Sequence, residues 1–108
     1  MSAPTRRHQE LRKALRLLAP LIPYSESEPV LERAAKLTRA DLSAGAALWL
    51  ALVAHVRHRF TDYDALLGEG YDRDAARHFV VDATEDVLED WGCSRRIDRE
   101  EKASDQRT

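Results

Sequence analysis

Ionisable side chains are concentrated in one short segment of the sequence, residues 55–64, which reads HVRHRFTDYD. Imidazole nitrogens and carboxylates are ligands that zinc, iron and manganese accept in proteins. On a helix, His55, His58 and Arg59 would fall on one side, and Asp62 would join them if the helix continued. The segment is therefore a candidate site, and its chemistry depends on how neighbouring elements position it.

Nine residues are candidate members of this polar cluster: His55, Arg57, His58, Arg59, Thr61, Asp62, Tyr63, Asp64 and Arg77. One interpretation is a divalent-metal site with His55, His58 and Asp62 or Asp64 as ligands, as in a metal-dependent hydrolase. The other is a structural network, in which Arg57 or Arg59 pairs with an aspartate and a histidine bonds a backbone carbonyl. We favour the network, because no further histidine or cysteine stands at ligand spacing. We therefore expect no cofactor and assign no catalytic residue.

The segment directly follows the most apolar part of the chain. Residues 46–54 are apolar on every side, which predicts a central helix over roughly 44–60, enclosed by its neighbours. Thr61 and Asp64 match a capping box, so a short helix is expected over about 62–67, after a sharp break.

Three further helices are predicted from apolar residues at helical spacing. The first covers about 5–18, the second starts near Pro29, and the last runs from about 72 to 91. The charged residues 94–108 are expected to form a disordered tail. The predicted fold class is thus all-α: a compact bundle of about five helices around a buried central helix, in one domain over residues 1–93.

Composition limits the class of protein. The chain has 108 residues, of which 44% are hydrophobic and 33% charged, and this balance is typical of a globular domain. No apolar run is long enough to span a membrane, and the N-terminus lacks the apolar region of a signal peptide. Cys93 is the single cysteine, so we expect a reducing, cytoplasmic location. Next to Gly92 and a charged tail, its thiol is expected to be exposed, without a general base beside it.

Part of the chain resembles a known family. The string RHRFTDYDALLGEGYDRDAARHFVVD and the preceding WLALVAHV are similar to an uncharacterised bacterial and fungal family, domain of unknown function 2293. The similarity covers about residues 44–91. It is carried by Arg57, His58, Thr61, Tyr63, Asp64, Leu66, Leu67, Ala76 and Arg77. The resemblance implies that the junction after the central helix is characteristic of the family, and it implies no activity.

The functional prediction is a non-enzymatic binding or interaction module for protein or nucleic acid. The net charge is only −2, but residues 5–16 are basic and residues 62–90 acidic, so the basic first helix is one candidate surface. Two further candidate binding surfaces are residues 55–59 and the charged C-terminal tail. The alternatives are the metal-dependent hydrolase and a domain that forms homo-oligomers.

Overall fold

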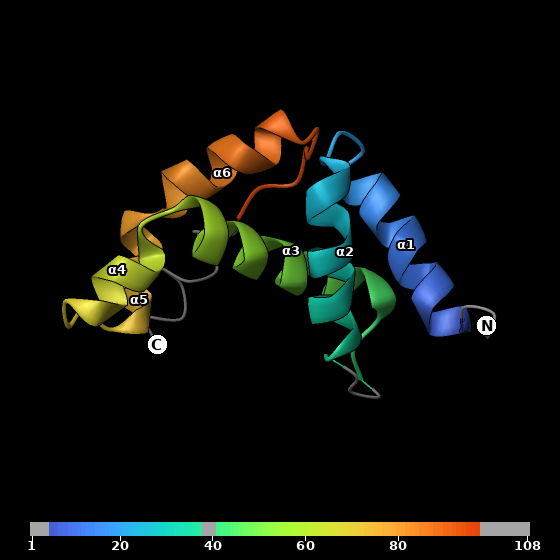
Figure 1. Ribbon diagram of the computed structural model, residues 1–108, viewed down its shortest axis with the longest axis horizontal. Helices are drawn as coiled ribbons and strands as arrows, with labels where there is room; N and C mark the ends of the chain where they lie inside the picture. Colours follow the sequence, from blue (N-terminus) through green and yellow to red (C-terminus); the bar gives the residue numbers. More distant parts are fainter. Residues whose placement is uncertain (1–4, 38–40, 98–108) are drawn as a thin grey trace, which may run out of the picture.

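The computed structural model describes residues 5–37 and 41–97, and all regular structure in this part of the chain is helical (Figure 1). The helices are α1 (Arg6–Leu18), α2 (Tyr24–Ala35), α3 (Ala44–Phe60), α4 (Tyr63–Gly68), α5 (Arg73–Phe79) and α6 (Val81–Asp90). The prediction of an all-α fold is confirmed. Among the described residues, no helix is both long and apolar enough to cross a membrane.

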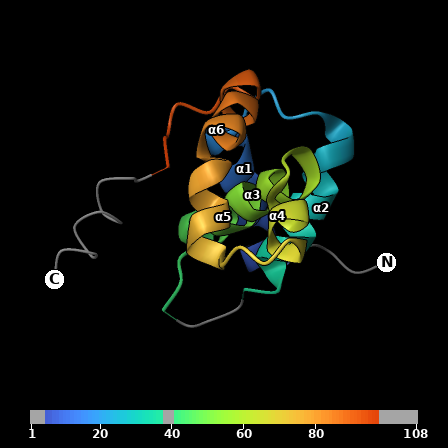
Figure 2. The same cartoon turned by 90° about the vertical axis from the view of Figure 1, so that its left-hand side faces the viewer.

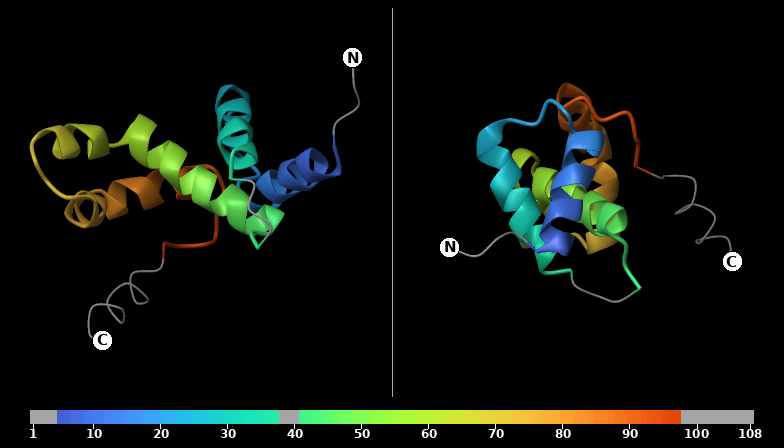
Figure 3. Two further views of the ribbon diagram at one scale, coloured as in Figure 1. Left: turned by 90° about the horizontal axis from the view of Figure 1, so that it is seen from below. Right: turned by 90° about the vertical axis from the view of Figure 1, so that its right-hand side faces the viewer.

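Helix α3 is the central element, as its all-round apolar sequence predicts. It packs against α1 and α2 toward one end and against α6 toward the other, with α4 and α5 beyond (Figures 1 and 3). Its fully buried side chains are Ala47, Leu48, Ala51, Leu52 and Val56. The alanines allow neighbouring helices to approach closely, and the larger side chains supply the buried apolar area. The Ser43 hydroxyl, rather than Asp41, caps the helix by accepting from the Ala46 amide at 3.1 Å.

Helix α2 begins earlier than predicted. It starts at Tyr24, directly after Pro23, so Pro29 lies inside the helix instead of at its first turn. Proline at that position removes one helical hydrogen bond. The helix persists because Val30, Leu31 and Ala34 are buried against the core. The early start places Glu26 in the first turn, on the face that carries Val30.

The predicted last helix is divided in two. The break is at Val80 (φ −105°, ψ 9°), and α5 and α6 follow one another end to end (Figure 2). Val80 is buried with Tyr63 and Ala76 in a small second core beneath α4, whereas Leu88 of α6 belongs to the main core on α3. The positions of α5 and α6 are therefore determined by two separate cores. The helical spacing of apolar residues continues from α5 into α6, so it does not reveal the break at Val80.

The end of α6 is joined to the connector between α1 and α2. The Leu21 amide donates to the Trp91 carbonyl at 2.9 Å. Gly92 follows with φ 81°, a conformation that favours glycine, and a Cβ there would lie 3.0 Å from Pro20 Cγ. This close approach and the positive φ both require a glycine.

The beginning of the predicted disordered tail is ordered. The Arg95 guanidinium lies over the Trp49 ring at 4.4 Å, and the Ile97 amide donates to a Glu85 carboxylate oxygen at 3.1 Å. Cys93 is buried rather than exposed, and its thiol donates to the Arg95 carbonyl. The prediction of disorder from residue 94 is therefore wrong for 94–97, and residues 98–108 lie outside the described part.

Candidate functional site

The turn between α3 and α4 is built on Thr61. Its hydroxyl donates to the Arg57 carbonyl at the end of α3 and accepts from the Tyr63 amide at 3.2 Å. Thr61 therefore terminates α3, and the predicted capping box with Asp64 does not form. Asp62 occupies the N-cap position of α4 without a side-chain cap bond, and its side chain is exposed.

Asp64 contacts a histidine instead of the predicted arginine. His58 Nδ1 lies 2.6 Å from Asp64 Oδ1, and the two side chains are 38% and 62% exposed. The His58 ring also meets the buried Tyr63 ring edge to face, with centroids 5.1 Å apart. The pair thus lies on the surface and connects the last turn of α3 to the first turn of α4.

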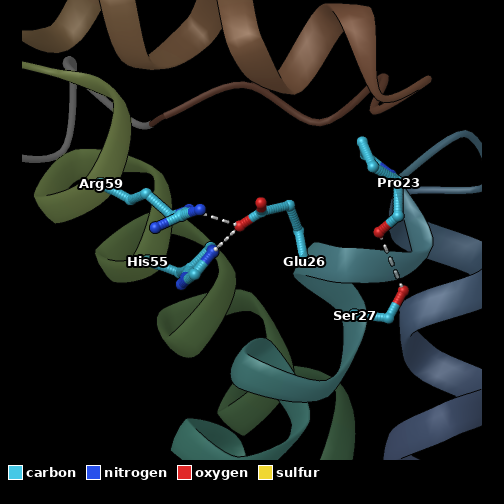
Figure 4. A network of polar contacts seen from close by, with 5 residues as sticks. All are labelled: Pro23, Glu26, Ser27, His55 and Arg59. Atoms are coloured by element: carbon cyan, nitrogen blue, oxygen red, sulfur yellow. Dashed lines mark hydrogen bonds and ion pairs between the residues drawn. The ribbon is translucent and has the colours of Figure 1, made fainter.

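A buried carboxylate that sequence reasoning missed organises the other side of α3. Glu26 Oε1 lies 2.7 Å from His55 Nε2 and 2.9 Å from Arg59 Nε (Figure 4). The Glu26 and His55 side chains are 8% and 9% exposed, whereas Arg59 is 60% exposed. We call these three residues the Glu26 triad. It connects α2 to α3, and not α3 to α4 as the sequence suggested.

Within the Glu26 triad, the charge of Arg59 compensates the charge of the Glu26 carboxylate. Burial alone would raise the pKa of the Glu26 carboxyl, but the hydrogen bonds from His55 and Arg59, together with the Arg59 charge, outweigh burial and hold that pKa below its ordinary value. An ionised carboxylate only accepts hydrogen bonds, so His55 Nε2 carries a proton and donates it. The Glu26 carboxylate is thus held by two hydrogen-bond donors from α3.

The structure separates the proposed metal ligands. His55 faces Glu26 on α2, whereas His58 faces Asp64 on α4. Within residues 5–37 and 41–97, no group of three or more histidine, cysteine, aspartate or glutamate side chains could hold a metal ion. The described residues therefore give no support to a metal site of His55 and His58 with Asp62 or Asp64.

Arg57 lies in a different environment from Arg59. It is half-buried, and its guanidinium lies over the Tyr63 ring, 5.4 Å from the centroid. Burial and the charge of nearby Arg77 lower the pKa of Arg57, with Tyr63 acting in the opposite direction. Arginine nevertheless stays protonated. Two like charges from α3 and α5 are thus held close together.

Arg57 and Arg77 border an open groove of about 370 Å³ between α2, α3 and α5, together with Arg33. Its remaining lining residues are apolar: Leu37, Trp49, Leu50, Ala51, Val53 and Ala54. We call this surface the arginine groove. Among the described residues, the ion pairs of Glu26, Glu28, Asp64 and Glu89 are made with other side chains than these three arginines. The sequence prediction assigned Arg57 and Arg77 to the polar cluster at the junction after the central helix, and it did not include Arg33.

Comparison with known proteins places the chain in a family without an assigned activity. The model of a family described as "Uncharacterized conserved protein (DUF2293)" matches residues 14–92, which include the Glu26 triad and the arginine groove. No curated protein matches the chain. No solved structure matches it either. Since the family model covers most of the sequence, the chain belongs to the DUF2293 family.

Proposed function

We propose that this domain is a non-enzymatic interaction module whose binding surface is the arginine groove. The observation that carries the proposal is the placement of Arg57 and Arg77 together beside an apolar floor. Like charges at close range destabilise a fold unless something neutralises them. An anionic partner, either protein or nucleic acid, would supply that neutralisation.

The basic first helix is a weaker candidate surface. Arg7 donates to the Leu42 carbonyl at 3.0 Å, and Arg12 pairs with Glu28 at 3.2 Å. These contacts use two of its basic side chains within the fold, and Arg6, Lys13 and Arg16 remain as its other cations. No residue of α1 lines the arginine groove.

Binding can be tested with two generic anions, a short oligothymidylate and a polyglutamate of similar length. We expect either anion to shift the Trp49 indole resonance in NMR spectra of the full chain at low ionic strength. The Arg77→Glu substitution should weaken that binding about tenfold, the loss expected for roughly 1.4 kcal/mol of charge interaction. Arg73→Glu is the matched control, because Arg73 is an exposed arginine of α5 outside the groove.

A substitution on the first helix separates the two surfaces. If Arg16→Glu abolishes binding and Arg77→Glu leaves it unchanged, the binding surface is α1 and the groove proposal is wrong. Absence of binding to both anions would also reject it. A cytoplasmic location and homo-oligomer formation stay predictions from the sequence.

A further inference from the structure

The floor of the arginine groove favours side chains of a protein over nucleobases. Bases bind to protein surfaces mainly by stacking on flat aromatic rings. Trp49 is the one aromatic ring that lines the groove, and Arg95, which does not line the groove, already lies over that ring at 4.4 Å. The other floor residues are aliphatic, and Leu50 is 50% exposed. Aliphatic and aromatic side chains of a peptide suit such a floor.

The groove residues on α3 form a stripe of defined length. Trp49, Leu50, Val53, Ala54 and Arg57 recur at helical spacing along one face. At 1.5 Å per residue, the stripe is about 12 Å long from Trp49 to Arg57. The apolar anchors of an amphipathic helix at positions i and i+7 are about 10 Å apart, so such a helix can place two anchors along the stripe.

The charges around the groove also favour a short acidic segment. Three arginines border the groove, but the whole chain has a net charge of −2. Exposed carboxylates of neighbouring elements include Asp72 at the start of α5 and Asp64 on α4. A long polyanion that extended beyond the groove would be repelled by them, whereas a short segment would meet only the arginines.

We infer that the occupant of the arginine groove is an acidic amphipathic segment of a partner protein. Its apolar side chains lie on Leu50 and Ala54, and its carboxylates pair with Arg57, Arg77 and Arg33. Arginine binds carboxylates in a two-pronged geometry, which gives direction as well as charge neutralisation. This inference rests on the proposed function, because it identifies the partner of the same groove.

Selection from a random peptide library displayed on phage tests the inference, with the full-length chain immobilised. We expect the enriched peptides to combine two or more carboxylates with apolar residues at i, i+3 or i+4, and i+7. Binding of those peptides should fall at least about tenfold in Arg77→Glu and in Leu50→Glu. The matched controls are Arg73→Glu and Leu17→Glu, since Leu17 is an exposed leucine of α1 outside the groove.

The outcomes separate this inference from the proposed function. No enrichment, enrichment of peptides without acidic residues, or binding that is insensitive to both groove substitutions would overturn the inference. If in addition the oligothymidylate binds and loses affinity in Arg77→Glu, the groove remains an anion-binding surface and its partner is nucleic acid. If no probe responds to the groove substitutions, the inference and the proposed function both fail.

Discussion

Arg57 and Arg59 lie two residues apart on α3 and have opposite electrostatic environments. Arg59 donates to the buried carboxylate of Glu26, so its charge is compensated within the fold. Arg57 lies over the Tyr63 ring and beside Arg77, whose charge lowers the pKa of Arg57. The Glu26 triad thus connects two helices within the fold, and the arginine groove is the surface that we propose for a partner. We therefore interpret Arg59 as a structural residue and Arg57 as a residue of the proposed binding surface.

The largest expected effect on stability comes from breaking the Glu26 triad. Glu26→Gln should lower the free energy of unfolding by about 3 kcal/mol, the low end of the range for losing one partner of a buried ion pair. Urea denaturation measures this loss. Glu28→Gln is the matched control, because its pair with Arg12 is about half exposed and should contribute less than about 1 kcal/mol. Equal losses in the two variants would show that Glu26 is not a structural centre.

Lowering the pH should remove the contribution of the Glu26 triad to the free energy of unfolding. The pKa of Glu26 is lower in the folded than in the unfolded chain, so its stabilisation is complete above the ordinary value of 4.5 and is lost as the pH falls through the folded pKa. The stability difference between the wild type and Glu26→Gln should therefore shrink as the pH falls below 4.5. Denaturation curves at successive pH values measure it. A difference independent of pH would contradict the assigned charge state.

A smaller effect is expected for the exposed pair at the α3–α4 turn. A buried Asp64 would make Asp64→Ala cost about 3–5 kcal/mol, but its side chain is 62% exposed. The expected loss is therefore below about 1 kcal/mol. A thermal melt compares this variant with the wild type, and Asp62→Ala serves as a control without the histidine contact. A loss as large as that of Glu26→Gln would place the structural centre at the turn.

The smallest effect should have the opposite sign. Arg77→Gln removes a like charge near Arg57, and we expect it to raise the free energy of unfolding by about 0.5 kcal/mol or less. High salt should reduce the gain, because it screens the repulsion. Arg73→Gln controls for the change in net charge. If Arg77→Gln destabilises the domain while the control does not, Arg77 has a structural partner and the contrast with Arg59 is lost.

Much of the fold follows from local sequence signals. The apolar residues 46–54 predicted the central helix, and the bounds of α3 agree with that prediction. Thr5 caps the first helix, and Gly92 follows the last one. The break at Val80 was not predicted, because periodicity carries no information on which of two cores each half contacts. The break at Val80 is determined by packing between segments far apart in the sequence.

The candidate site was predicted less well. Arg57 and Arg77 were expected to lie near the same junction, and both line the groove. Glu26 was missed because Pro29 was interpreted as the start of its helix. One signal was present: the apolar face of Val30 and Ala34, extended back by one turn, reaches position 26. A carboxylate at a position expected to be buried requires hydrogen-bond donors or a cation nearby, and α3 offered His55 and Arg59.

The hydrogen bond between Leu21 and Trp91 has a consequence for synthesis on the ribosome. It joins the segment between α1 and α2 to the C-terminal end of α6. The first three helices emerge before the residues that complete this contact, so the nascent domain keeps part of its apolar surface uncovered until Gly92 has left the exit tunnel. Chains that stop before Trp91 should therefore remain open and aggregate, however well their individual helices form.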